Sequence, residues 1–392
     1  MKHIISIFVT IVILSAFTAN AARRDSSMFQ GMTHRVTADI RPVYNMATHG
    51  FYRGWNDYGK SIPMAASAHL KYSFGLSHES KLGSLYPTAY QGVGVAVHTF
   101  FNHEITGTPA ILYIFQGSRI ADLSSKISLD CEWTLGASYG WKVNEVVGSK
   151  CNIYINVGLP FTWHISPMWD FSFGPEYTHF SNGDTTFPNG GANTTGLRAG
   201  LTAKFNEPAS VKAPGSLFLG EEEYLQDKTF KERISYDILA FGAWRADRAI
   251  DGYNLHIINK AFPLGGIHIN PLYRLNRYFS TGASLDLTFD RSADITLIIN
   301  EDTDELGEIK YPPLTKQTAV GLSVRGELTM PFFSINLGAG YNFLTGSNDL
   351  RGFYSLYSLK GFISERVFLN IGYRLSSILF THNLMFGIGV RI

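Results

Sequence analysis

The sequence has almost no excess of charge of either sign and very little cysteine. Its 33 Lys and Arg residues offset 32 Asp and Glu residues, which leaves a formal net charge of +1. A nucleic-acid-binding protein needs a basic stripe that neutralises phosphates, so nucleic acid is excluded as a partner. The only two cysteines, Cys131 and Cys151, could form at most one disulfide, which their positions in the expected strands test below.

Long apolar runs are also missing, except at the N-terminus. There an apolar stretch from Ile4 to Leu14 follows a basic start and precedes the small-residue sequence Ala19-Asn20-Ala21. This order is typical of a secretory signal peptide, and the stretch is short for a membrane-spanning helix. We therefore expect residues 1–21 to be a signal peptide that is cleaved after Ala21, and the rest of the chain to be exported to the cell envelope.

The remainder of the chain lacks the helical periodicity of a large soluble enzyme and instead alternates between apolar and polar residues. Between Ile127 and Trp141, apolar side chains occupy the odd positions, whereas Ser, Asp, Glu, Thr and Gly occupy the even ones. The same alternation recurs in 333–342 and 384–392. Segments of about ten alternating residues separated by turns are typical of the strands of a transmembrane β-barrel.

A soluble β-sandwich would also alternate, but it would bury its apolar face against a second sheet. Tryptophans near the strand ends favour a barrel, because aromatic girdles form at the two membrane interfaces. The residues expected in these girdles are Trp133, Trp141, Trp163, Trp169 and Trp244.

The alternation predicts an all-β fold, a transmembrane antiparallel up-and-down barrel of about sixteen strands. The expected strands are 33–44, 65–76, 91–101, 109–119, 127–142, 152–164, 169–181, 193–205, 233–246, 264–276, 280–291, 318–329, 332–344, 352–362, 366–376 and 381–392. An even strand number places both ends of the barrel on the periplasmic side. The loops 45–64, 182–192 and 292–316 then fall outside.

A polar stretch, 206–232, interrupts the pattern after eight strands and is expected to be a periplasmic linker. It separates the first half of the barrel, 22–205, from the second half, 233–392. One barrel of sixteen strands is the preferred interpretation. A barrel of 12–14 strands and two tandem eight-stranded barrels stay open as alternatives.

The expected strand positions argue against a disulfide between the two cysteines. Cys131 lies in the middle of one expected strand and Cys151 at the outer end of the next. With a turn near residue 147, Cys151 would face a residue near 143, which is too far from Cys131 for a bridge. Two free thiols without a metal role are expected.

A group of polar residues lies on the outward, apolar row of the expected hairpin 169–205. His179 and Ser181 are two residues apart on one strand, so they share a face. Asn193 begins the outward row of the next strand. A hydroxyl, a base and a group that orients the base are the requirements of nucleophilic catalysis.

The segment His179-Phe180-Ser181-Asn182-Gly183, followed by Pro188-Asn189-Gly190-Gly191-Ala192-Asn193, resembles the active-site hairpin of the outer-membrane lipid A 3-O-deacylase family and its larger acyloxyacyl hydrolase relatives. The resemblance implies an outer-membrane serine hydrolase that removes an ester-linked acyl chain from lipid A, the lipid of lipopolysaccharide. His179 would be the general base and Ser181 the nucleophile. Asn182 and Gly183 would contribute to the oxyanion hole. No metal or cofactor is implied.

The resemblance also implies partners: lipid A and lipopolysaccharide, other outer-membrane lipids, and the barrel-assembly machinery during insertion. One departure concerns the catalytic acid, because Asn193 stands where the small enzymes carry Glu. An amide can hold a histidine ring by hydrogen bonding but cannot stabilise the imidazolium by charge. The nearest acids are Glu176, expected in the lumen, and Asp184, expected in a loop.

The alternative function is a non-catalytic pore or structural barrel that keeps a degenerate active-site hairpin. The resemblance to the small enzymes covers only the first eight strands, and the other eight carry charges expected to face inward. These charges would line or plug a wet lumen. They are Asp286, Arg325, Glu327, Arg374 and Arg391.

Overall fold

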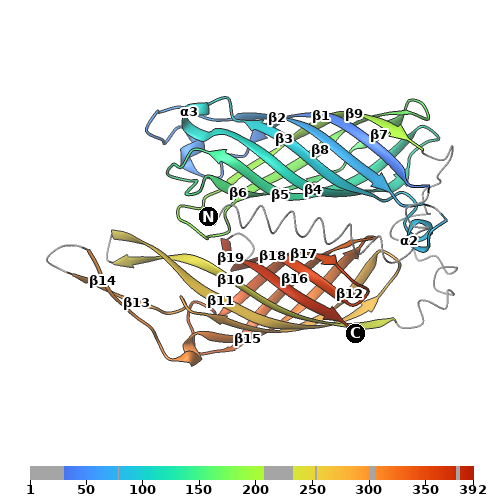
Figure 1. Ribbon diagram of the computed structural model, residues 1–392. Coiled ribbons are helices and arrows are strands. Elements are labelled where there is room, and N and C mark those ends of the chain that lie inside the picture. The colour runs from blue at the N-terminus through green and yellow to red at the C-terminus, as the bar shows by residue number, and fades with distance from the viewer. Residues whose placement is uncertain (1–30, 78, 207–232, 252–253, 301–304, 377–379) are drawn as a thin grey trace. The chain divides into compact units, whose positions relative to one another are not determined.

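The computed structural model describes residues 31–77, 79–206, 233–251, 254–300, 305–376 and 380–392. The chain divides into two compact units, and each is described by itself. Both are built from antiparallel strands (Figure 1). Of the helices in the described ranges, none is long and apolar enough to cross a membrane. The expected signal peptide and the expected linker 206–232 lie outside the described residues, except for Asn206.

The first unit is a closed barrel. Its strands are β1 (Thr33–Asn45), β2 (Met64–Gly75), β3 (Tyr90–Thr99), β4 (Gly107–Asp122), β5 (Ile127–Trp141), β6 (Cys151–Gly158), β7 (Phe161–His164), β8 (Trp169–Ser181) and β9 (Ala192–Phe205). Strand β1 pairs with both β2 and β9, and β4 pairs with β5, which closes the ring. Strands β6 and β7 each pair with β5 on one side and β8 on the other, so together they form one interrupted strand and the barrel counts as eight-stranded.

Short helices decorate the ends of this barrel. The 3-10 helix η2 (Gly50–Arg53) lies in the β1–β2 connection, α2 (Lys81–Leu85) in the β2–β3 connection and α3 (His103–Thr106) in the β3–β4 connection. The β1–β2 and β8–β9 connections leave from the same end, and the short β4–β5 and β7–β8 turns lie at the other.

The second unit is another closed barrel of eight strands. They are β10 (Ile234–Asp251), β11 (Asn254–Arg274), β12 (Phe279–Asp290), β15 (Thr318–Thr329), β16 (Phe333–Thr345), β17 (Gly352–Phe362), β18 (Val367–Ser376) and β19 (Phe380–Arg391). Strands β13 (Thr296–Asn300) and β14 (Glu305–Lys310) form a separate hairpin within the β12–β15 connection, which ends in η4 (Leu314–Lys316).

The prediction of an all-β antiparallel barrel is confirmed, and two tandem eight-stranded barrels are the form it takes. The preferred single barrel of sixteen strands was wrong, as was the 12–14-strand alternative. Strand β9 returns to β1, with His34 facing Phe205, instead of continuing the sheet into β10. Strand β19 closes onto β10 in the same way, with Val390 opposite Ile238. Eight strands are enough to close a barrel whose interior side chains can fill.

The strand positions agree with the expected ones, with three differences. The expected strand 152–164 is interrupted at Leu159 and Pro160, because proline has no N–H to donate to the ladder. Strand β10 continues beyond residue 246 to Asp251, and β11 begins at Asn254, ten residues before the expected start at 264. The β13–β14 hairpin occupies the expected outer loop 292–316.

The barrels present apolar side chains outward and polar side chains inward. In β8, Phe171, Phe173 and Tyr177 are exposed, whereas Ser172 and Thr178 are buried. A soluble protein does not display so extended an apolar surface. The alternation therefore identifies lipid-facing barrels and excludes the β-sandwich, which would cover one apolar face with a second sheet.

Charged side chains fill the lumen of the first barrel. Arg41 lies 2.7 Å from Asp39 and 3.0 Å from Glu176. Lys71 lies 3.0 Å from Asp39 and 2.9 Å from Glu132. All five residues are buried, so these side chains compensate one another's charges within the barrel.

The charges predicted to face the lumen of the second barrel do so. Arg325 contacts Asp286 at 2.8 Å, and Arg391 contacts Glu327 at 2.6 Å. Arg374 is also buried. The first contact joins the neighbouring strands β12 and β15, and the second crosses the interior from β19 to β15. Such side chains fill the interior, as is usual for barrels of eight strands.

Three of the five expected girdle tryptophans are exposed and two are buried. Trp163, Trp169 and Trp244 are exposed, whereas Trp133 and Trp141 are buried. At Gly140 the backbone has φ +108, which interrupts the alternation of β5 and turns the next residue inward. There the indole of Trp141 donates to Ser138 Oγ at 2.9 Å.

Both cysteines are free, as expected. Cys151 faces Tyr139 across the β5–β6 ladder, and not a residue near 143, because the connection between these strands is longer than expected. Cys131 lies further down β5, opposite Ser118 of β4.

Candidate active site

The hairpin of β8 and β9 carries the residues predicted to be catalytic. His179 and Asn193 face each other directly across its ladder, and Phe180 faces Ala192. Phe180 points into the barrel and is buried in an aromatic cluster with Trp141 and Tyr154. This inward anchor sets its two neighbours, His179 and Ser181, on the outward row.

The imidazole of His179 is held by an amide. Its Nδ1 lies 2.7 Å from Asn193 Oδ1, and the same oxygen accepts a hydrogen bond of 2.6 Å from the Tyr177 hydroxyl. The Nδ2 of Asn193 donates to Thr48 Oγ1 at 3.4 Å. An amide oxygen only accepts, so Nδ1 carries the proton and Nε2 carries the lone pair of the neutral ring.

The hydroxyl of Ser181 donates to the side chain of Asn189, with 3.1 Å between Oγ and Oδ1. The backbone N–H of Asn182 donates to the same Oδ1 at 3.0 Å. One amide oxygen therefore lies beside both the candidate nucleophile and the first candidate oxyanion donor. The second expected donor, Gly183, follows directly with φ +66.

Backbone contacts from distant parts of the barrel hold the loop that carries Asn189. Asn189 forms a bridge with Val147 of the β5–β6 connection. On either side of it, Gly148 donates to Pro188 at 2.7 Å and Gly190 donates to Val146 at 2.8 Å. The amide of Asn189 is thus presented to Ser181 from a fixed backbone.

The β1–β2 connection supports the other side of the hairpin. The Tyr52 hydroxyl donates to the carbonyl of Gly191 at 2.7 Å, and the Met46 N–H donates to the carbonyl of Asn193 at 2.8 Å. Gly191 has φ +62, and a Cβ there would lie 2.5 Å from the carbonyl oxygen of Phe180. Only glycine suits this position without strain.

Burial separates the two candidate catalytic groups. His179 is half-buried, whereas Ser181 is only 2% exposed although it belongs to the outward row. Both groups were expected to lie openly on the exterior. The hydroxyl is instead buried and donates to Asn189, so a substrate must displace this hydrogen bond.

Glu176, one of the two acids that were considered as replacements, does not orient the histidine. Glu176 points into the lumen, as expected, and its Oε2 lies 3.0 Å from Nη1 of Arg41. Asp184 lies in the β8–β9 loop with φ +59. The Nδ1 of His179 already has Asn193 as its partner, so the amide itself occupies the orienting position.

Three residues that complete the arrangement were not predicted from the sequence. Tyr177 lies on the same outward row as His179, and Asn189 stands in the quoted loop motif, so the sequence could have pointed to both. Thr48 lies in an expected outer loop, and the sequence could not have identified it, because its approach to Asn193 depends on how that loop folds.

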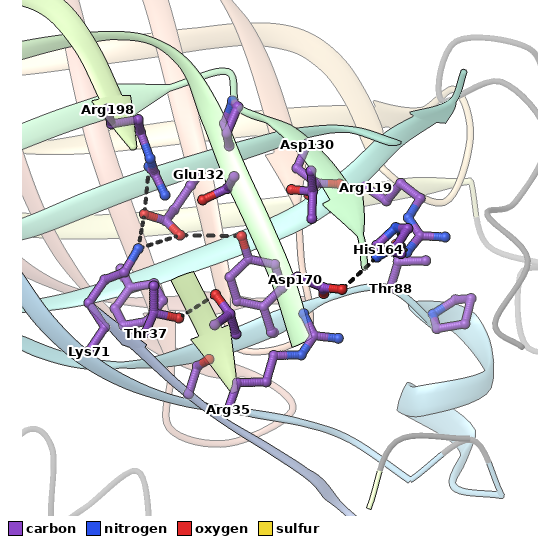
Figure 2. Close-up of a pocket in the computed structure, with 18 residues that line it drawn as sticks. Arg35, Thr37, Lys71, Thr88, Arg119, Asp130, Glu132, His164, Asp170 and Arg198 are labelled. Carbon is purple, nitrogen blue, oxygen red and sulfur yellow. Dashed lines mark hydrogen bonds and ion pairs between the residues drawn. The ribbon is translucent and has the colours of Figure 1, made fainter. Parts of the chain in front are cut away.

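A polar pocket lies at the opposite end of the first barrel, near the starts of β1 and β8 (Figure 2). Its side chains are paired: Arg198 contacts Glu132 at 2.8 Å, and His164 contacts Asp170 at 2.9 Å. Within the described ranges, no group of His, Cys, Asp and Glu residues is arranged to hold a metal ion.

Comparisons with known families match both barrels. A family model described as "Lipid A 3-O-deacylase (PagL)" matches residues 31–202. A second model, described as "Acyloxyacyl hydrolase, C-terminal domain", matches residues 234–392. The first match contains β8, the β8–β9 connection and β9 up to residue 202. No curated protein matches the chain.

Solved structures similar to this chain include other barrels at low identity. Neisserial surface protein A is 14% identical with a TM-score of 0.29, over 45% of this chain and 98% of that one. CdiB from Acinetobacter baumannii is 11% identical with a TM-score of 0.20, over 93% of this chain and 60% of that one. The NanC porin is 8% identical with a TM-score of 0.16, over 90% and 98%. The fold assignment depends on the strand pairing and not on these scores.

Proposed function

The chain belongs to the lipid A 3-O-deacylase family, and on that premise we propose that it is an outer-membrane serine esterase that removes a 3-O-linked acyl chain from lipid A. The observation that carries the proposal is the contact of 2.7 Å between His179 Nδ1 and Asn193 Oδ1. It leaves Nε2 as the basic atom of a ring that Asn193 holds in place, and Tyr177 in turn donates to the oxygen of Asn193.

In the proposed reaction, His179 Nε2 takes the proton of Ser181 as its Oγ attacks the ester carbonyl. The carbon–oxygen bond to the sugar then breaks, and the sugar hydroxyl leaves with the proton from His179. Water attacks the resulting acyl-serine with His179 again as base, which releases the fatty acid and restores the hydroxyl. No redox step or metal is needed.

The position of Asn189 supports the assignment of the oxyanion donors. Its amide oxygen lies 3.1 Å from Ser181 Oγ and accepts from the N–H of Asn182. An ester carbonyl that approaches the nucleophile needs a similar pair of neighbours. We infer that the substrate carbonyl replaces the Asn189 amide, and that the N–H groups of Asn182 and Gly183 then stabilise the developing oxyanion.

The orientation and surroundings of the hairpin suit a lipid substrate. Next to His179 on the outward row of β8 are Tyr177, Phe173 and Phe171, all exposed on the lipid-facing side. The longest connection of the first barrel, between β1 and β2, lies at the hairpin's end, whereas the short β4–β5 and β7–β8 turns lie at the other. In barrels of this type the short turns are periplasmic, so the hairpin lies at the extracellular end. Insertion by the barrel-assembly machinery after export is part of the same proposal.

A pore is the weaker alternative. Ion pairs cross the lumens of both barrels, and a cluster with Phe51, Tyr52, Phe100 and Phe180 packs the interior of the first near the end of β8. A conducting channel needs a continuous wet path. Conductance in planar bilayers comparable with that of a porin would favour the pore over the enzyme.

The direct test uses purified full-length protein in detergent micelles with lipid A, and measures the released fatty acid by mass spectrometry. We expect release by the wild type and none above background by Ser181→Ala. Ser172→Ala is the matched control, because this serine lies on the same strand but faces the lumen. EDTA should not change the rate. Equal release by wild type and Ser181→Ala would refute the assignment of the nucleophile.

A further inference from the structure

Two cations in the second barrel share one aromatic ring without a carboxylate between them. Lys260 Nζ donates to the Tyr311 hydroxyl at 3.1 Å and lies 5.6 Å from the centre of its ring. The guanidinium carbon of Arg291 lies 3.8 Å from the same centre. We name these three residues the Tyr311 cluster.

A buried amide fixes the guanidinium of the cluster. Arg291 Nη1 donates to Gln317 Oε1 at 2.9 Å, and Gln317 Nε2 donates back to the Arg291 carbonyl at 3.2 Å. Gln317 is fully buried. A guanidinium has five N–H donors in a planar fork, and the other donors of Arg291 have no partner among the described residues. They are therefore oriented in advance for a ligand.

The charges of the cluster are not neutralised locally. Lys260 is exposed, while Arg291 and Tyr311 are half-buried. Over the described ranges, neither Lys260 nor Arg291 forms an ion pair with a carboxylate. The exposed Glu308 lies two residues from Lys310, on the same face of β14. Its nearest cation in the sequence is therefore Lys310 and not a member of the cluster. Two cations held close together by a neutral phenol repel each other, and an anion between them relieves the repulsion.

The place of the cluster in the barrel indicates which anion reaches it. Lys260 lies in β11 before the part that pairs with β12, Arg291 follows β12, and Tyr311 follows β14 (Figure 1). The short turns 275–278, 330–332 and 363–366 lie at the other end of the barrel. The cluster thus belongs to the end with the longer connections, which faces the outer leaflet in barrels of this type.

We propose that the Tyr311 cluster binds a phosphate of a phosphorylated glycolipid headgroup of the lipid A type in the outer leaflet. Arg291 supplies a planar fork for two phosphate oxygens, Lys260 a point charge, and Tyr311 keeps the two in register. The proposal rests on the outer-membrane placement proposed above, and it gives the second barrel a role in holding the headgroup. It does not require the hydrolytic step.

The test measures the Kd of full-length Ser181→Ala protein in detergent micelles for bisphosphorylated lipid A and for the same lipid with its phosphates removed. Ser181→Ala prevents consumption of the probe. Lys260→Gln/Arg291→Gln should raise the Kd for the phosphorylated lipid by about tenfold or more, since each charge-assisted contact contributes about 1.5–3 kcal/mol before losses. The Kd for the dephosphorylated lipid should not change.

Two further variants separate binding from folding. Lys126→Gln removes an exposed lysine from the β4–β5 turn of the first barrel and should leave both Kd values unchanged. Lys260→Arg keeps the charge and should bind within about threefold of the parent, because only the hydrogen-bond geometry changes. Heat-modifiable migration on gels checks that each variant is folded.

Three results would overturn the proposal: no loss of affinity in the double variant, an equal loss for both lipids, or inorganic phosphate that competes at the concentration of the lipid. The last would identify a site for free phosphate. A wild-type protein that binds the phosphorylated lipid through Lys260 and Arg291 but releases no fatty acid would refute the esterase and leave the cluster intact. If the wild type released fatty acid but the double variant bound the phosphorylated lipid with an unchanged Kd, the cluster would be refuted and the esterase would stand.

Discussion

The Nδ1 atom of His179 lies 2.7 Å from Oδ1 of Asn193, its direct partner across the β8–β9 ladder. This contact fixes the tautomer, because the amide oxygen can only accept. The resemblance to the small deacylases implies a carboxylate in this place. The comparison between amide and carboxylate is therefore the sharpest way to question the site.

Asn193→Glu should retain or increase the rate of deacylation. A carboxylate would hold the same Nδ1–H and would also stabilise the imidazolium that forms as Ser181 loses its proton. A charged acceptor makes a hydrogen bond roughly twice as strong as a neutral one, so we expect an increase in kcat of up to about tenfold. The Thr48 hydroxyl, which now accepts from Asn193, can donate to the carboxylate.

Asn193→Ala is the control, and it should lower kcat by about tenfold because the ring loses its orienting partner. Both variants are compared in the fatty-acid release assay. If Glu reduced the rate as much as Ala, the role of residue 193 as the partner of the base would be wrong.

Tyr177→Phe should lower kcat by about two- to tenfold with little change in KM. The hydroxyl donates to Asn193 Oδ1 at 2.6 Å, and loss of one neutral hydrogen bond weakens the position of the amide by about 0.5–1.5 kcal/mol. Steady-state kinetics in micelles separate the two parameters. A change confined to KM would show that Tyr177 contacts substrate instead of positioning Asn193.

Asn189→Ala should raise kcat/KM, by about two- to tenfold. In the free protein its amide oxygen occupies both the Ser181 hydroxyl and the Asn182 N–H, and a substrate must break these two hydrogen bonds. The backbone bridge to Val147 does not involve the side chain, so the loop should keep its place. A loss of more than tenfold would mean that Asn189 contributes to the transition state, contrary to the displacement proposed above.

Gly191→Ala should destabilise the hairpin by about 1–3 kcal/mol and reduce activity. The new Cβ would lie 2.5 Å from the Phe180 carbonyl oxygen, in a backbone with φ +62. Gly59→Ala is a matched control, because Gly59 has φ +61 but a Cβ added there would meet nothing within 4 Å. The temperature of the shift in gel mobility measures both variants. Equal shifts for the two would assign the whole effect to φ and none to the collision.

Local periodicity predicted most strands, but it could not predict how they close. Alternation predicted both ends of the strand Trp169–Ser181 correctly, because the face of each side chain follows from that of its neighbours. Closure depends on pairing between β1 and β9, which lie far apart in sequence. Nothing in a strand's own pattern says whether its free edge meets β1 or a ninth neighbour.

In the candidate site, too, local contacts could be predicted from the sequence and contacts with distant segments could not. Counting residues along two rows of one hairpin places His179 opposite Asn193, and the structure has that pair. The contact between Ser181 and Asn189 could not be counted in this way. It depends on a loop whose position is set by Val147 and Gly148, some forty residues earlier in the chain.

The central claim is that Ser181, with His179 as its base, hydrolyses an ester of lipid A. Mass spectrometry of lipid A from cells that express the wild type, Ser181→Ala or no protein tests it most directly. The account predicts that only the wild type yields lipid A lighter by one ester-linked acyl chain, while Ser181→Ala matches cells without the protein. The same acyl pattern with wild type and Ser181→Ala, at equal levels of folded barrel, would contradict it.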